Sequence, residues 1–192
     1  MTLDQSEGYE EVAEQFMAAR SDIGATFVRS WARANLPPSS LVVDVGCGSG
    51  LPIAHALIED GFSVYGIDAS PSLLSAFRRR FPNAHSACEA AQDSVYFHQV
   101  FDAAVSIGLV FLLSANDQRQ VIHQVANALR PGGHFLFTAP WQTCKWQDVL
   151  TKRQSQSLGK QEYRRLLEES GLRLIGCHEE ENHFYHAVKP LH

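Results

Sequence analysis

The fold of this chain is decided by the stretch LVVDVGCGSGLP at residues 41–52. Residues 41–45 form a short and almost continuous apolar run, which is typical of a strand buried on both faces of a parallel sheet. Three alternating glycines follow, and they predict a turn where a ligand lies against the backbone, because no Cβ blocks its approach. A helix over residues 51–60 is expected next.

A second acidic position supports this interpretation. Asp68 ends the next apolar run, residues 63–67, and it lies 24 positions after Asp44. An acid at the end of the second strand of such a unit can accept hydrogen bonds from both hydroxyls of a ribose. The two features together predict a site for a nucleoside-bearing cofactor at the carboxyl edge of a parallel sheet.

The pattern of the remaining chain predicts alternating strands and helices. Apolar residues at helical spacing predict two helices within residues 7–35, and Ser70-Pro71 and Ser114 are typical helix starts. The last two strands are joined by only four residues, 179–182, so they are expected to pair antiparallel. Residues 142–158 show no clear periodicity. Further strands are expected at residues 63–67, 84–87, 102–107, 134–139, 172–178 and 183–189, and a further helix at residues 160–170.

Composition excludes several classes of function. The 192 residues fit one domain, and 45% hydrophobic and 19% charged residues are ordinary for a globular protein. The net charge of −5 favours neither nucleic acid nor an anionic membrane as a partner. Four scattered cysteines form no Cys-x-x-Cys pair, so neither a zinc site nor a redox dithiol is indicated. With an acidic, polar start unlike a signal peptide, the chain is expected to be cytoplasmic and to bind no metal.

Four motifs now stand in order: residues 42–50, 66–71, 101–106 and 129–135. In this order and spacing they resemble the class I methyltransferases that depend on S-adenosylmethionine (SAM), in particular small bacterial members. The resemblance implies a single α/β domain, residues 1–192, with a Rossmann-like, mostly parallel seven-stranded sheet, an antiparallel final strand and helices on both faces. It also implies an N-terminal helical lid, residues 1–38, over a SAM-binding core, residues 39–192.

The same resemblance implies which residues bind SAM. Members of the family bind adenine after the third strand, often with an Asp-Ala-Glu run, and spacing aligns that run with Ala90-Ala91-Gln92; a shifted alignment offers Glu89 instead. The expected cofactor-binding residues are Asp44, Gly46, Cys47, Gly48, Asp68, Ala69, Ala91, Gln92, Ser106 and Ile107.

The acceptor is expected to be a small molecule. The Asn- or Asp-Pro-Pro-Tyr motif of nucleic-acid amino methyltransferases is missing at residues 106–109, and no Pro-Cys nucleophile of the cytosine C5 enzymes is present. In-line methyl transfer depends mainly on alignment, which can contribute about 7–11 kcal/mol, so no catalytic residue is named. The expected walls of the acceptor site are Tyr9, Phe16, Arg20, Leu109, Trp141 and Trp146.

Two other functions fit parts of the sequence. A SAM-binding module without catalytic activity is compatible with Ala90 in place of the usual acid and with the lack of an evident base. An NAD-dependent reductase fits less well, because the dinucleotide motif Gly-x-Gly-x-x-Gly would need glycine where Leu51 stands.

Overall fold

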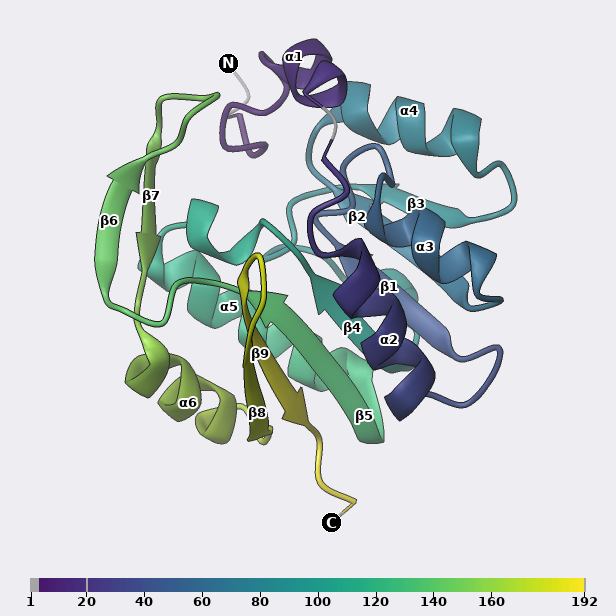
Figure 1. The fold of residues 1–192 in the computed structure, drawn as a ribbon, viewed down its shortest axis with the longest axis vertical. Coiled ribbons are helices and arrows are strands. Elements are labelled where there is room, and N and C mark those ends of the chain that lie inside the picture. The colour runs from purple at the N-terminus through teal and green to yellow at the C-terminus, as the bar shows by residue number, and fades with distance from the viewer. Residues whose placement is uncertain (1–3, 20, 192) are drawn as a thin grey trace.

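The computed structural model describes residues 4–19 and 21–191, and its centre is a seven-stranded sheet (Figure 1). The strand order is β3-β2-β1-β4-β5-β9-β8, in which β9 runs antiparallel to both neighbours and the other pairs are parallel. The predicted fold class is therefore confirmed. The strands are β1 (Leu41–Val45), β2 (Ser63–Asp68), β3 (His85–Cys88), β4 (Phe101–Ser106), β5 (Leu129–Thr138), β8 (Arg173–Glu179) and β9 (His183–Val188).

Helices cover both faces of this sheet. Buried residues of α2 (Ala25–Asn35), α3 (Ile53–Glu59) and α4 (Pro71–Arg80) pack on one face. Those of α5 (Ala115–Ala128) and α6 (Lys160–Glu169) pack on the other. The short α1 (Ala13–Ala18) lies beside α4 (Figure 1). No helix in the described part of the chain is long and apolar enough to cross a membrane.

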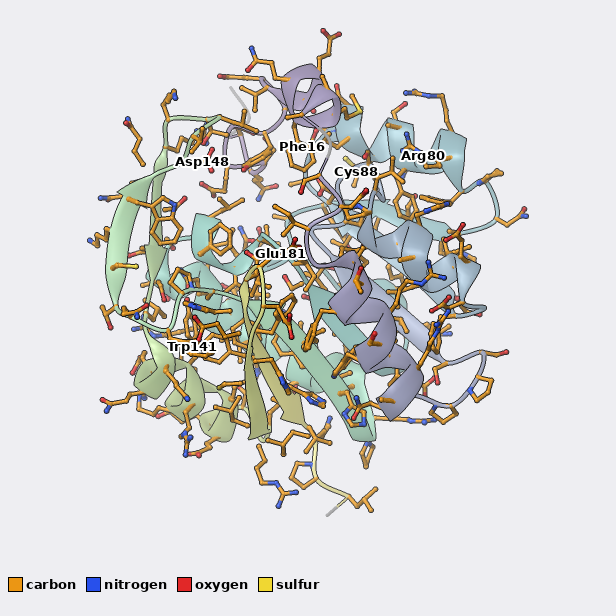
Figure 2. The ribbon with its side chains drawn as sticks, viewed as in Figure 1. Phe16, Arg80, Cys88, Trp141, Asp148 and Glu181 are labelled. Carbon is orange, nitrogen blue, oxygen red and sulfur yellow. The ribbon has the colours of Figure 1, made fainter. Side chains whose placement is uncertain are left out.

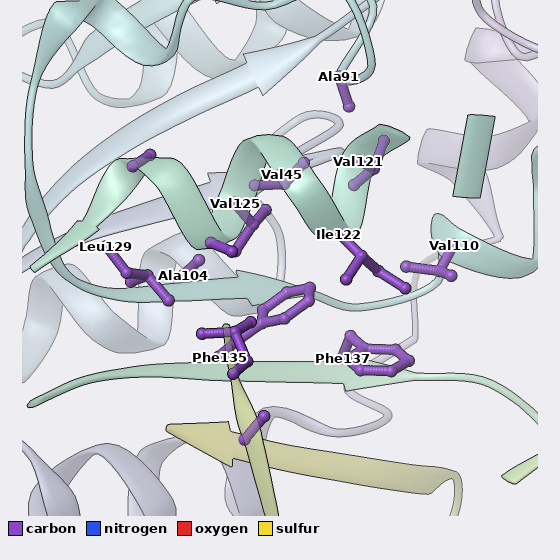
Figure 3. Packing of buried hydrophobic residues seen from close by; sticks show 14 of the residues in the cluster. Val45, Ala91, Ala104, Val110, Val121, Ile122, Val125, Leu129, Phe135 and Phe137 are labelled. Carbon is purple, nitrogen blue, oxygen red and sulfur yellow. The ribbon is translucent and has the colours of Figure 1, made fainter. Parts of the chain in front are cut away.

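The alternation of side chains along each strand builds two separate cores. Phe135 and Phe137 of β5 face α5 and α6, whereas Leu136 between them faces the side of α2 and α3. Figure 3 shows the first core, where Val121, Ile122 and Val125 of α5 lie over these strands. Full burial of each such side chain contributes about 1.5–3 kcal/mol, so the sheet is the rigid base of the molecule.

Local sequence signals set the helix starts as predicted. The Ser70 hydroxyl accepts a hydrogen bond from Leu73 N–H, and the Ser114 hydroxyl accepts one from Asp117 N–H. Each bond satisfies one of the N–H groups that the first turn of a helix leaves without a partner.

Two segments differ from the prediction. The fifth strand begins at Leu129 rather than at residue 134, because Leu129 already pairs with Phe101 of β4. Residues 130–133 then form an irregularity, with Gly132 at a φ of 78°, before the pairing resumes at His134. Residues 142–158, which had no clear periodicity, contain a separate hairpin of β6 (Cys144–Gln147) and β7 (Gln154–Ser157). Short strands without alternating apolar residues carry too weak a pattern to be recognised.

Partly buried histidines gather around the buried His186 where α2 packs on β5 and β9. His134 Nδ1 and His186 Nε2 are 2.9 Å apart, and the Trp31 ring of α2 packs edge-on against His186. Burial, with His134 and His178 nearby, lowers the pKa of His186 to about 4. His186 therefore stays neutral in the folded protein at pH values where it is charged in the unfolded chain.

This difference predicts acid sensitivity. As the pH falls from about 6.5 to about 4, the unfolded state takes up a proton at His186 before the folded state does, so the free energy of unfolding decreases over that window. We expect a loss on the order of 3 kcal/mol. Urea titrations at several pH values measure it, with His186→Phe as the comparison. An equal loss in His186→Phe would assign the acid sensitivity to other groups.

Candidate cofactor and acceptor site

The glycine turn sits at the carboxyl edge of β1 and is fixed by hydrogen bonds to β2. Gly46 N–H and Cys47 N–H both donate to the carbonyl oxygen of Ile67, at 2.8 and 3.0 Å. Gly48 N–H donates to Oδ2 of Asp68 at 2.7 Å, and Ser70 N–H donates to Oδ1 of the same carboxylate at 2.8 Å. One carboxylate thus joins the glycine turn to the start of α4.

Two glycines of the turn are required by their surroundings. Gly46 has a φ of 79°, and a Cβ there would lie 2.8 Å from Cβ of Leu109. Gly48 has a φ of 52°, and a Cβ would come within 3.4 Å of the Phe16 ring. Both glycines therefore have a positive φ that other residues rarely adopt, and both line a cavity beside the turn.

Asp44 lies behind this turn and carries an unpaired polar atom. The residue is 2% exposed, and its Oδ2 makes no hydrogen bond to any described residue. Burial, with the nearby charge of Asp68, raises the pKa of Asp44 to about 8. Leaving a buried acceptor unpaired costs about 1–3 kcal/mol, which a ligand with N–H groups would recover.

A cavity of about 270 Å³ opens beside the turn. Its walls come from the turn, the end of β2, the loop after β3, the segment after β4 and the N-terminal segment. Of the residues expected from sequence, it brings together Gly46, Gly48, Asp68, Ala69, Ala91, Gln92, Ile107, Tyr9, Phe16 and Leu109. Glu89 also lines it, so both alignments of the adenine segment remain compatible with the structure.

A second hollow of about 480 Å³ adjoins the first. It contains Asp44 and Cys47, and both hollows share the rings of Phe16 and Phe111 in their walls. Burial raises the pKa of the Cys47 thiol well above its usual value, so Cys47 stays a thiol and is not a nucleophile.

The N-terminal segment, residues 4–18, closes over the first cavity and is held on both sides. On the α4 side, the Glu10 carboxylate accepts hydrogen bonds from the Ser72 N–H and from the hydroxyls of Ser70 and Ser72. On the opposite side, the Tyr9 hydroxyl donates to Oδ2 of Asp148 in the β6–β7 hairpin at 3.3 Å. Residues from three distant parts of the chain therefore enclose the cavity.

Three of the expected residues that the structure describes are not in either wall. Ser106 is fully buried and donates to the Val45 carbonyl oxygen. Trp141 stacks on His183 with ring centroids 4.3 Å apart, well away from Phe16 and Asp148 (Figure 2). Trp146 packs on the outer side of Phe111, with ring centroids 5.4 Å apart. Arg20 lies outside the described residues.

Comparison with known proteins agrees with this geometry. Residues 42–133 match the family model described as a methyltransferase domain. Residues 42–133 are therefore assigned to a methyltransferase domain. The chain is 33% identical over 112 residues to the putative methyltransferase YqeM of Bacillus subtilis, covering 56% of this chain and 45% of the relative.

A second sequence relative and a solved structure are also similar to this chain. The chain is 33% identical over 120 residues to the 18S rRNA (guanine(1575)-N(7))-methyltransferase of Saccharomyces cerevisiae, covering 57% of this chain and 43% of that protein. The match thus spans less than half the length of either relative. The fold is shared with SAM-bound CalS10, an amino pentose methyltransferase from Micromonospora echinaspora (TM-score 0.73, 17% identity, 91% of this chain and 96% of that chain).

Three residues of the methyltransferase site were missed by sequence reasoning. Glu10 and Asp148 hold the N-terminal segment, and Arg80 donates to the Ser49 carbonyl oxygen at 2.7 Å and so supports the glycine turn. Arg80 belongs to a run of three arginines, residues 78–80, which is typical of a solvent-exposed helix face. No local sequence pattern marks Glu10 or Asp148. In the described part of the chain no three His, Cys, Asp or Glu side chains gather to hold a metal ion.

The anchoring role of Glu10 predicts a local effect of its removal. In Glu10→Ala, the N-terminal segment loses its bonds to the first turn of α4, while the sheet core is untouched. We expect amide exchange in residues 6–18 to accelerate about tenfold with almost no change in the Tm. Hydrogen exchange with mass spectrometry measures this, and Glu11→Ala, an exposed neighbour, is the matched control. Unchanged exchange would show that Glu10 does not anchor the segment.

Proposed function

We propose that the chain transfers the methyl group of SAM to a small-molecule acceptor. The observation that carries the proposal is the arrangement of the glycine turn, Asp68 and the loop at residues 89–92 around one cavity, with the unpaired oxygen of Asp44 in the adjoining hollow. An adenosine and an amino acid joined through sulfur have parts that match each of these features.

The residues present fit SAM part by part. Asp44 Oδ2 is a partner for the α-amino group, and the backbone of Gly46, Cys47 and Gly48 leaves room for the methionine part. Asp68 retains lone pairs for the ribose hydroxyls although each oxygen already accepts one backbone N–H. Ala91 with Gln92, or Glu89, would bind the adenine, flanked by Ala69 and Ile107.

The chemistry supplied by SAM is an already activated methyl group on a sulfonium. What the chain contributes is alignment: the rigid turn fixes the donor, while the N-terminal segment and the β6–β7 hairpin exclude water and confine the acceptor. The rings of Phe16 and Phe111 stand where the two hollows meet and border the transfer path. No basic side chain is required for an acceptor that is already nucleophilic.

A small acceptor is favoured over RNA by charge and by shape. The name of the yeast relative makes ribosomal RNA the second candidate. The net charge of −5 and the enclosure of the cavity by the N-terminal segment both oppose a polyanion, whose binding depends on basic residues.

The four cysteines form no disulfide, which fits the reducing cytoplasm proposed for the protein.

The first test removes the proposed ribose partner. Asp68→Ala loses hydrogen bonds to a charged group, each worth about 1.5–3 kcal/mol, so the Kd for SAM should rise about 100-fold. Isothermal titration with SAM and with S-adenosylhomocysteine (SAH) measures this. Glu168→Ala, which removes an exposed carboxylate on α6, should bind like the wild type. Unaltered affinity in folded Asp68→Ala would place the cofactor elsewhere and refute the proposed site.

The second test uses the raised pKa of Asp44. Below about pH 8 the free protein holds this carboxyl protonated, whereas an ammonium ligand favours its ionised form. SAM binding should therefore release protons, and its Kd should decrease as the pH rises from 6 to 8, by up to about tenfold per unit. Titration in buffers of different ionisation enthalpy measures the protons. If Asp44→Asn shows the same pH dependence, another group is responsible.

A further inference from the structure

The acceptor side of the cavity is marked by two carboxylates that the cofactor proposal does not use. Among the acids that line the cavity, Asp68 is held by the glycine turn, and Glu89 accepts a hydrogen bond from the Ser94 hydroxyl. Glu7 and Asp148 remain, and they come from the N-terminal segment and the β6–β7 hairpin. Both lie on the parts that close over the cavity rather than on the sheet.

The oxygens of Asp148 have different surroundings. Its Oδ1 accepts hydrogen bonds from the N–H groups of Leu150 and Thr151 and from the Thr151 hydroxyl, and these bonds form the tip of the hairpin. From the described residues, its Oδ2 accepts a single hydrogen bond, from the Tyr9 hydroxyl at 3.3 Å. This oxygen thus has free lone pairs at the cavity, in a position fixed by the bonds on the other oxygen.

The electrostatics of the cavity favour a positively charged guest. No Lys, Arg or His is among the described residues that line it, and the nearby Arg153 is paired with Asp4 outside. The unpaired Oδ2 of Asp44 lies in the adjoining hollow and is assigned to the α-amino group of SAM. With the donor accounted for in this way, the carboxylates of Glu7 and Asp148 have no cationic partner among the described residues that line the acceptor side.

Aromatic rings complete this environment. Tyr9 and Phe16 meet edge to face with centroids 5.4 Å apart, and Phe111 lines the same cavity. Ring faces together with carboxylates form the usual protein environment for an ammonium group. They would not suit a carboxylate or phosphate acceptor, which the acids would repel.

Resting on the proposed function, we propose that the acceptor is a small amine and that Asp148, positioned by Tyr9 across the cavity, is the residue that selects it. The amine enters as an ammonium ion, bound by Asp148 Oδ2, and then loses one proton to water. Its nitrogen lone pair forms the new N–C bond to the methyl carbon while the C–S bond breaks, and that bonding pair goes to sulfur. The products are an N-methylated ammonium ion and neutral SAH.

The test is a panel of matched acceptors. Primary amines are compared with the alcohol and the carboxylate of the same skeleton, such as benzylamine, benzyl alcohol and benzoate, and with longer aliphatic sets. SAH release gives turnover, and SAM titration of the same samples reports on the cofactor site. Asp148→Asn is the chosen variant because the amide oxygen can keep the bonds of the hairpin tip. Glu11→Gln removes the same charge from an exposed position outside the cavity.

The expected result is turnover of amines without turnover of their alcohols or carboxylates. Asp148→Asn should raise the KM for the amine at least about tenfold with a smaller change in kcat, and Tyr9→Phe should raise it less; Glu11→Gln should match the wild type. Preferred methylation of an alcohol or carboxylate, an unchanged KM in Asp148→Asn, or bound SAM with no amine methylated would each overturn the inference. Absence of SAM binding would instead refute the proposed function.

Discussion

The hydrogen bonds of the Asp68 carboxylate are the interaction on which the site depends. Its two oxygens accept from Gly48 N–H in the glycine turn and from Ser70 N–H at the start of α4. The end of β2 therefore fixes both the glycine turn that follows β1 and the start of α4. The same carboxylate lies in the cavity wall, so the group that holds the backbone also faces the proposed ligand.

The parts of the site that the sequence predicts are those encoded locally. The apolar run of β1, the glycines after it and the cap at Ser70 each depend on residues within a few positions, and their patterns are specific. The enclosure depends on long-range contacts instead: Tyr9 and Asp148 are 139 residues apart, and Glu10 and Ser72 are 62 apart. No local pattern carries such pairings, so they become visible only once the chain is folded.

One expected site residue, Trp141, shows how sequence position can mislead. Trp141 comes three residues after the end of β5, where the ligand edge of the sheet is expected, yet its ring stacks on His183 and lies under Lys160. The missing information was the β6–β7 hairpin, which begins at Cys144 and brings Asp148 rather than Trp141 over the cavity. The cavity wall is thus formed by a residue of the hairpin inserted after β5, and not by the residue near the end of that strand.

The distribution of stability in the molecule matches the need for ligands to enter. The sheet is held by fully buried aromatic and aliphatic side chains, whereas the N-terminal segment is held mainly by polar contacts such as the exposed Asp4–Arg153 pair. Exposed ion pairs contribute about 0–1 kcal/mol, far less than a buried ring. Opening of the segment therefore costs little and leaves the glycine turn intact. The proposed cofactor and acceptor would enter past this weakly held segment, while the buried contacts of the sheet preserve the geometry of the glycine turn.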